Sequence, residues 1–507
     1  MQVGAVAVVL AASTYKVFEL DRYFVPKELA LHATALLAGL LAVGAFRRAH
    51  FTRVDLLLLA YLLLGALSAL TATNPWLAAR ALAVSASGVA IFWAARGVRE
   101  AGMARPLLGA LAFAVVVGAA TSLLQTYGVR TDLFSVNRAP GGTLGNRNFV
   151  AHLAAFGLPV VLLAALRAWR GAGYMIGTAG VMMVAASLVL TRSRAAYLAF
   201  GAVLLVFLAA MFVSGPLRRH GRTWMRLVGI LALAGSGVAA ALLLPNTLRW
   251  RSENPYLETV QGVANYQEGS GRGRLVQYQR SLRMTAGSPL LGVGPGNWPV
   301  EYPEHAAPRD PSLDRREPGT TSNPWPSSDW IAFVSERGPV AAILLALALL
   351  SIAAGGVRRL VGARDADEGL AAATLLATVV AAGVAGAFDA VLLLALPTLL
   401  VWAALGALWD PGVEQPATPS SLPALALVVV ALAAGVGAAR STAQLAAMRV
   451  YATRNAPAAL ERAARIDPGS YRLRLRLARS GNQKQRCKHA RAAHALFPSA
   501  QAARGLS

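Results

Sequence analysis

The 507-residue chain has a single cysteine, Cys487, and few charged residues for its length. One cysteine excludes an internal disulfide and a cysteine-based metal site. Charged residues make up 14% of the sequence, whereas soluble domains contain about 25%. Hydrophobic residues reach 56%, and the mean hydropathy is +0.51. The composition therefore excludes an ordinary soluble domain and indicates a membrane protein.

Acidic residues are also scarce: 24 Asp and Glu face 48 Lys and Arg, which gives a formal net charge of +24. In a soluble protein this excess would suggest binding to nucleic acid. Here the basic residues lie mainly at the ends of apolar runs, where phospholipid headgroups are the expected contacts. We therefore expect a phospholipid membrane as a partner and no nucleic acid.

Several familiar catalytic motifs are missing from the sequence. It contains no GxSxG or Walker pattern, and no His, Cys and Asp spacing suggests a metal site. The glycines between Gly292 and Gly296 resemble a dinucleotide fingerprint, but that motif requires a soluble βαβ unit, which this context does not predict. The sequence therefore predicts neither a cofactor nor a bound metal.

Long apolar runs recur along the chain, each of about the length that crosses a hydrocarbon core of roughly 30 Å. Because backbone polar groups in lipid need internal partners, such runs predict helices. The expected fold class is an all-α, polytopic membrane protein with about 12–13 transmembrane helices. The spans are expected near residues 3–18, 29–46, 54–72, 76–95, 106–126, 149–168, 174–191, 195–214, 226–244, 329–357, 369–388, 390–408 and 422–439.

These spans divide the chain into four regions. Residues 1–244 hold the N-terminal transmembrane helices, 245–328 form one large polar loop, 329–440 hold the remaining helices, and 441–507 form a basic tail. In the tail, an Ala-rich helix end at 458–469 recurs at 492–498, close to the period of a tetratricopeptide repeat. We expect a short tetratricopeptide-like helical tail. The alternating run 472–477 leaves a strand open as the less favoured alternative.

Arginine clusters in alternate short loops predict the orientation. One set of loops, which includes Arg96, Arg99 and Arg105, holds about twice the basic residues of the other set. The positive-inside rule assigns this set to the cytoplasm. The amino terminus is then cytoplasmic, and the large loop and the carboxyl terminus lie outside.

Four arginines on the predicted outer side are candidates for binding an anion. Arg192 and Arg194 lie in a tight turn between two spans, and Arg272 and Arg274 precede an amphipathic stretch in the large loop. A guanidinium pairs bidentately with phosphate oxygens, which suits a diphosphate clamp. The alternatives are snorkelling towards lipid headgroups for the first pair and plain solvation for the second.

Other polar residues near the outer boundary are candidates for a sugar site or for a general base. Asn146 and Asn148 open a span and could contact a glycan, although Asn146 could equally only cap its helix. His305 in the large loop could act as a base, as could Asp329 at the start of a span. Helix capping is the alternative for Asp329, and a loop histidine without a role is the alternative for His305. Asp389 is a further acid at the membrane boundary.

Together these stretches resemble the O-antigen ligase/polymerase superfamily of bacterial membrane glycosyltransferases. The likeness covers about residues 130–410. Its most specific part is the Pro-Leu-Leu-Gly-x-Gly run that begins at Pro289. The other matching pieces are Gly145-Asn146-Arg147-Asn148, Thr191-Arg192-Ser193-Arg194, Gly273-Arg274-Leu275 and Glu336-Arg337-Gly338.

The resemblance implies a protein of the bacterial inner membrane. Such a protein transfers a glycan from an undecaprenyl diphosphate carrier to an acceptor hydroxyl, on the periplasmic face and without a metal ion. It also implies that Arg194 and Arg274 hold the diphosphate. The family usually carries a His-Asn pair where this sequence has Ser327 and Ser328. The usual candidate base is therefore missing, and Asp329 or His305 is the expected substitute.

Several functional alternatives stay open at this stage. The enzyme could be a ligase that passes the glycan to a lipid or protein acceptor, or a polymerase that extends a glycan. A polysaccharide-precursor transporter would need charged or broken helices near the bilayer midplane and related halves, which the sequence does not display. A non-catalytic scaffold, with a protein partner bound through the tail, is the third hypothesis.

Overall fold

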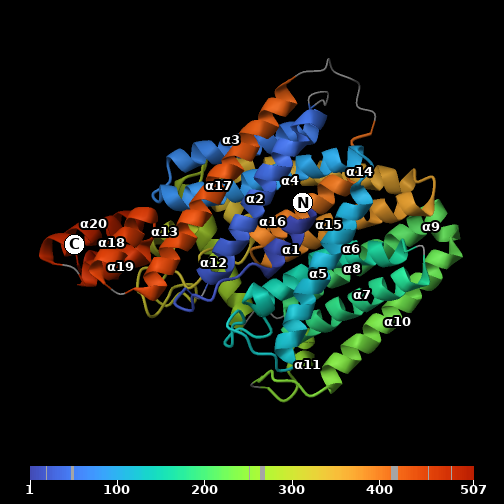
Figure 1. Cartoon of the computed structure of the whole chain (residues 1–507), viewed down its shortest axis with the longest axis horizontal. Coiled ribbons are helices and arrows are strands. Elements are labelled where there is room, and N and C mark those ends of the chain that lie inside the picture. Colours follow the sequence, from blue (N-terminus) through green and yellow to red (C-terminus); the bar gives the residue numbers. More distant parts are fainter. Residues whose placement is uncertain are drawn as a thin grey trace.

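The computed structural model describes residues 1–18, 20–46, 51–168, 170–250, 252–262, 269–412, 421–454, 456–480 and 482–506. Within these ranges the protein is all-helical, and the only β-pairing is an isolated bridge between Leu313 and Thr321. The membrane helices form one bundle, and the C-terminal helices lie at one end of the molecule (Figure 1). The predicted all-α class is confirmed.

The helices of the bundle follow the predicted spans closely. They are α1 (Gln2–Leu10), α2 (Asp21–Phe46), α3 (Arg53–Leu70), α4 (Pro75–Glu100), α5 (Ala104–Thr126), α6 (Arg147–Leu166), α7 (Gly171–Thr191), α8 (Arg194–Val213), α9 (Gly215–Arg219), α10 (Gly221–Leu243), α14 (Asp329–Val361), α15 (Ala366–Phe388), α16 (Ala395–Leu408) and α17 (Leu422–Thr453). Among the described residues, 11 helices are long and apolar enough to cross a membrane. The chain is a multi-pass membrane protein.

Two of the thirteen expected spans form helices that are shorter than predicted. The α1 helix has 9 residues and α16 has 14. After α1, the Lys27 ammonium donates hydrogen bonds to the carbonyls of Val9 and Ala11 at 2.9 and 2.7 Å, which fixes the point where the chain leaves the helix. Before α16, residues 389–394 are not helical. Hydropathy alone does not register these breaks, because both segments remain apolar.

The large loop between α10 and α14 contains three helices: α11 (Pro255–Gln261), α12 (Gly269–Gly287) and α13 (Trp298–His305). The loop is joined to α14 at a kink, where Gly338 has a φ of 81° and is followed by Pro339. Proline has no N–H, so it cannot donate to the carbonyl four residues before it. That carbonyl, on Ser335, instead accepts the N–H of Val293 at 3.0 Å.

The same junction is closed by Glu336 and by glycines of the loop. The Glu336 carbonyl accepts the N–H of Gly294 at 2.9 Å, and its carboxylate accepts those of Gly296 at 2.8 Å and Trp298 at 3.3 Å. A Cβ on Gly294 would lie 2.4 Å from the Cβ of Ala72, so this close approach requires glycine. The Pro-Leu-Leu-Gly-x-Gly run therefore anchors the loop to the membrane helices.

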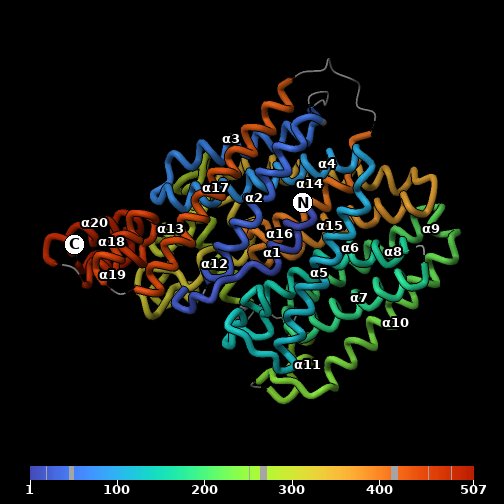
Figure 2. Tube along the Cα trace, viewed as in Figure 1, coloured from blue at the N-terminus to red at the C-terminus, as the bar shows by residue number. Residues whose placement is uncertain are grey.

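The C-terminal tail comprises α18 (Pro457–Ile466), α19 (Tyr471–Ser480), α20 (Gln483–Leu496) and α21 (Gln501–Arg504). The alternating run 472–477 is helical, so the strand alternative is wrong. Figure 2 shows the tail packed beside the loop helices. The N–H of Gln501 donates to the Pro318 carbonyl at 3.0 Å, and the Asn74 amide donates to the Leu496 carbonyl at 3.2 Å. The tail therefore docks on the loop and on the start of α4, and its tetratricopeptide character stays a prediction.

Candidate functional site

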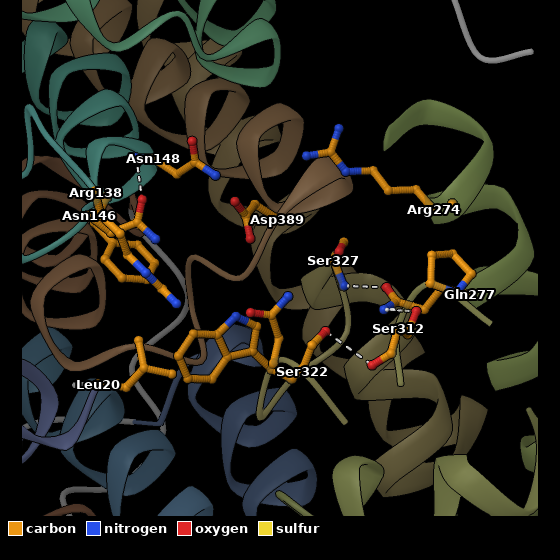
Figure 3. Close-up of a pocket in the computed structure, with 15 residues that line it drawn as sticks. Leu20, Arg138, Asn146, Asn148, Arg274, Gln277, Ser312, Ser322, Ser327 and Asp389 are labelled. Carbon is orange, nitrogen blue, oxygen red and sulfur yellow. Dashed lines mark hydrogen bonds between the residues drawn. The ribbon is translucent and has the colours of Figure 1, made fainter. Parts of the chain in front are cut away.

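A polar cavity of about 250 Å³ lies where the large loop meets the first turn of α6 and the non-helical segment after α15. We refer to it as the loop cavity. Figure 3 shows its lining side chains, which come from stretches far apart in the sequence. The residues that matter for its chemistry are Arg138, Asn146, Asn148, Arg274, Ser327 and Asp389.

Arg274 is positioned by the rest of α12. The Tyr278 hydroxyl, one turn further on, donates to the carbonyls of Ser327 at 2.6 Å and Ala387 at 2.9 Å. The Gln277 side chain accepts the Ser327 N–H at 2.6 Å. These bonds tie α12 both to the start of α14 and to the end of α15. These hydrogen bonds fix the position of α12, and α12 in turn places Arg274 at the cavity.

Asn146 and Asn148 approach the cavity from the start of α6. The Asn146 side chain accepts the N–H of Asn148 at 3.0 Å, so Asn146 is the N-cap of this helix. Both asparagines also line the cavity. In Figure 3, the Asn148 amide and the Arg274 guanidinium point towards Asp389 from different elements. Asn146 thus caps α6 and lines the cavity at once, and Asn148 lines it from the same turn.

Asp389 is the carboxylate of this cavity, and its side chain is 15% exposed. Its Oδ1 accepts the N–H of Ala390 at 2.9 Å, and its Oδ2 lies 3.6 Å from Nε2 of His152 on α6. The His152 side chain is 2% exposed, and neither ring nitrogen has a hydrogen-bond partner among the described residues. Asp389 was visible in the sequence as an acid at the membrane boundary. Nothing in its spacing from His152 indicated that the two would pair.

The two residues predicted as the base lie elsewhere. Asp329 is fully buried, and its two carboxylate oxygens accept the N–H groups of Val391 at 2.9 Å and Leu392 at 2.8 Å. It holds the non-helical segment that presents Asp389, and it does not line the loop cavity. His305 ends α13 and is also absent from the cavity lining. The geometry does not favour either prediction.

The four arginines predicted to bind the diphosphate do not all lie at the same site. Only Arg274 lines the loop cavity, whereas Arg272 is exposed and is not part of its lining. Arg192 has a positive φ of 56°, stacks over the Trp250 ring at 4.9 Å and donates from Nε to Thr259 at 3.0 Å. The Arg194 guanidinium packs against Gly262, where an added Cβ would lie 2.6 Å from it. The 192–194 turn thus supports the α11 region of the loop.

Ser327 and Ser328 occupy the positions of the expected His-Asn pair. Ser327 lines the cavity, whereas Ser328 caps α14 by accepting the Ile331 N–H at 3.4 Å and donates to the Gly386 carbonyl at 3.1 Å. A serine hydroxyl does not titrate near neutral pH. The only carboxylate in the cavity lining of the described chain is Asp389, so it is the group there that can accept a proton.

Comparison with known proteins identifies one family. A family model described as O-antigen ligase matches residues 179–346, which include α8, the large loop and the kink of α14. No curated protein matches the chain. The matched segment contains Arg274 and Ser327 but ends before Asp389.

Proposed function

Since the chain belongs to the O-antigen ligase family over residues 179–346, we propose that it transfers a glycan from an undecaprenyl diphosphate carrier to an acceptor hydroxyl. The reaction takes place in the loop cavity, on the periplasmic face of a bacterial inner membrane. One observation supports this most strongly: a fixed cation, Arg274, and a carboxylate, Asp389, line the same polar cavity. Whether the acceptor belongs to a growing glycan or to a lipid is left open by this chemistry.

In this proposal, Arg274 binds the diphosphate of the donor. When the bond between the sugar C1 and the diphosphate oxygen breaks, the electron pair and negative charge go to the leaving diphosphate. A preorganised guanidinium stabilises that charge without reorganisation of solvent. Arg138 lines the same cavity and adds a second positive charge. These residues supply the charge stabilisation, so the proposal requires no metal ion.

Asp389 is proposed as the general base. Its carboxylate takes the proton of the acceptor hydroxyl while the acceptor oxygen forms the new bond to C1. His152 lies behind Asp389 at 3.6 Å and positions the carboxylate, with Ala390 holding the other oxygen. Asn146 and Asn148 are proposed to contact the sugar hydroxyls. Asp329 takes the role of a positioning residue through its hold on residues 391 and 392.

The first test is turnover of an undecaprenyl diphosphate-linked glycan by the purified full-length protein in nanodiscs. We expect Arg274→Ala to reduce turnover at least about 100-fold, the usual cost of removing a group that stabilises transition-state charge. Arg283→Ala is the matched control, because Arg283 lies on the same helix but is exposed and outside the cavity. Turnover by wild type should survive EDTA.

Two outcomes would contradict the proposal. One is a wild-type protein that releases no undecaprenyl diphosphate under any acceptor condition. The other is an Arg274→Ala variant as active as Arg283→Ala. In the second case, catalysis would have to be sought near the 192–194 turn.

A further inference from the structure

A second cavity, of about 320 Å³, lies between the membrane helices and the C-terminal tail. We refer to it as the tail cavity. Its floor comes from α2 and α4, one wall comes from the loop segment 314–325, and the opposite wall comes from residues 467–472 and Phe497 of the tail. The tail is docked by hydrogen bonds on both sides of this space. The tail therefore forms one wall of this cavity.

The tail cavity and the loop cavity adjoin. Leu20, Ser322 and Trp325 line both of them. The Trp325 ring packs edge-on against Phe24 at 5.0 Å and tilted against Phe149 at 6.3 Å. These aromatic rings therefore lie where the two cavities meet.

Charge distinguishes the tail cavity from its neighbour. Six carboxylates and three guanidiniums line the tail cavity, whereas one carboxylate and two guanidiniums line the loop cavity. An excess of carboxylates disfavours a phosphorylated or acidic ligand. The same groups accept hydrogen bonds from hydroxyl or ammonium donors. The tail cavity thus suits a ligand rich in hydrogen-bond donors and without negative charge.

One of these carboxylates has an unused acceptor. Glu28 is 6% exposed, and its Oε1 accepts the Arg80 Nε–H at 2.7 Å. Its Oε2 is buried and makes no hydrogen bond to any part of the chain that the structure describes. Buried polar atoms are nearly always paired, by protein, water or ligand. Glu28 therefore presents an acceptor at the floor of the cavity.

Aromatic rings complete the lining. Tyr471 and Phe497 of the tail lie together with ring centroids 4.9 Å apart, and Phe24 and Trp325 lie on the membrane side. Flat apolar rings combined with a few polar groups that fix orientation form the general pattern of a small-molecule site. Sugar rings offer both an apolar face and a rim of hydroxyls, so they match rings and carboxylates in one space.

We propose that the tail cavity is a glycan-binding subsite that holds a neutral or amine-bearing acceptor saccharide beside the loop cavity. The assignment rests on the proposed function for its role in transfer, while the binding itself is a separate property. In this arrangement, the tail is a wall of the substrate site rather than a docking surface for a protein partner. The acceptor hydroxyl reaches Asp389 past Trp325.

The experiment measures saccharide binding without any donor, by isothermal titration of the full-length protein in nanodiscs. The probes are three trisaccharides: chitotriose, its fully deacetylated amine form, and trigalacturonate. We expect binding of at least one of the first two and none of the acidic one. Tyr471→Ala should weaken binding about tenfold, as for loss of one aromatic contact surface. Tyr471→Phe and Arg491→Ala, an exposed tail position, should bind like wild type.

A second variant controls for the possibility that Tyr471→Ala disrupts the fold of the tail. Gln444→Trp places a large ring in the cavity from α17 and leaves the residues of the tail itself unchanged, and it should also reduce binding about tenfold. The proposal is overturned if no trisaccharide binds wild type, if trigalacturonate binds best, or if Gln444→Trp binds normally. Trisaccharide binding that persists in a protein without transferase activity would refute the proposed function and leave the subsite standing. Equal loss of binding in Arg274→Ala and Tyr471→Ala would overturn the separate subsite.

Discussion

The loop cavity and the tail cavity share Trp325 but are built differently. The loop cavity is formed by the large loop and the ends of membrane helices, and basic residues outnumber acidic ones in its lining. The tail cavity needs the C-terminal helices to close it, and its lining is dominated by carboxylates. One is suited to an anion and the other to a polyol. Two adjacent spaces of opposite charge would keep a diphosphate and an uncharged acceptor from exchanging places.

The first test of this comparison removes Asp389, the proposed proton acceptor of the loop cavity. We expect Asp389→Asn to lower turnover about 10²–10³-fold, as for loss of a general base. Donor binding should be retained or become tighter, because the change preserves shape and removes a negative charge that repels the diphosphate. Steady-state kinetics, together with titration of farnesyl diphosphate, check this prediction.

His152→Gln serves as the companion variant, since His152 acts through Asp389 rather than on substrate. It should reduce turnover less than Asp389→Asn and alter the pH profile of turnover. Normal kinetics for Asp389→Asn would return Asp329 and His305 to consideration.

Substitution of Trp325, which lines both cavities, should have an intermediate effect on ligand binding. Trp325→Ala should weaken binding of both farnesyl diphosphate and chitotriose, each by about tenfold, because the ring lines both cavities. Trp325→Phe keeps an aromatic wall against Phe24 and should stay close to wild type. Isothermal titrations with the two ligands provide the measurement. A variant that loses only one of them would show that Trp325 belongs to a single site.

The smallest effect concerns Asp467, at the tail side of the tail cavity. Burial raises the pKa of Asp467; Arg440 opposes this rise, and Asp21 adds to it. A raised pKa in the folded state means that ionisation costs stability, so docking of the tail weakens as pH rises through that pKa. Asp467→Asn should therefore raise the thermal midpoint at pH 7.5, by on the order of a degree.

At a pH below the ordinary carboxyl range, both proteins carry a neutral group and the difference should vanish. Thermal unfolding of the full-length protein at pH 3 and pH 7.5 gives the comparison. A variant that is less stable than wild type at pH 7.5 would mean that the electrostatic attraction of Arg440 outweighs the burial of Asp467.

Much of the fold could be predicted from apolar runs, because the hydrocarbon core sets the length of each helix. The differences between the predicted and the observed spans are local. The α1 and α16 helices are shorter than expected, since their boundaries depend on Lys27 and Asp329, whose side chains hold backbone far away in sequence. Hydropathy averages over a window and does not detect such bonds.

The site was predictable only in part, for the same reason. Arg274 and the two asparagines were identified because their residue types and positions suit a diphosphate or a sugar, and all three line the loop cavity. Asp389 could be seen only as an acid at the membrane boundary, because its pairing with His152 depends on how α6 packs against α15. The tail cavity could not have been predicted at all, since its walls come from many stretches that lie far apart in the sequence.

The break in α14 at Gly338 and Pro339 has a consequence for access. The carbonyls of Ser335 and Glu336 belong to residues that are almost fully buried, so water is a poor substitute for the N–H groups of Val293 and Gly294. Lifting this stretch would leave the Ser335 carbonyl without a partner and the Glu336 carbonyl with only the Ser68 hydroxyl, which donates to it at 2.8 Å. These bonds therefore disfavour residues 292–297 as a hinged cover, and we expect this stretch to stay in place while a substrate binds.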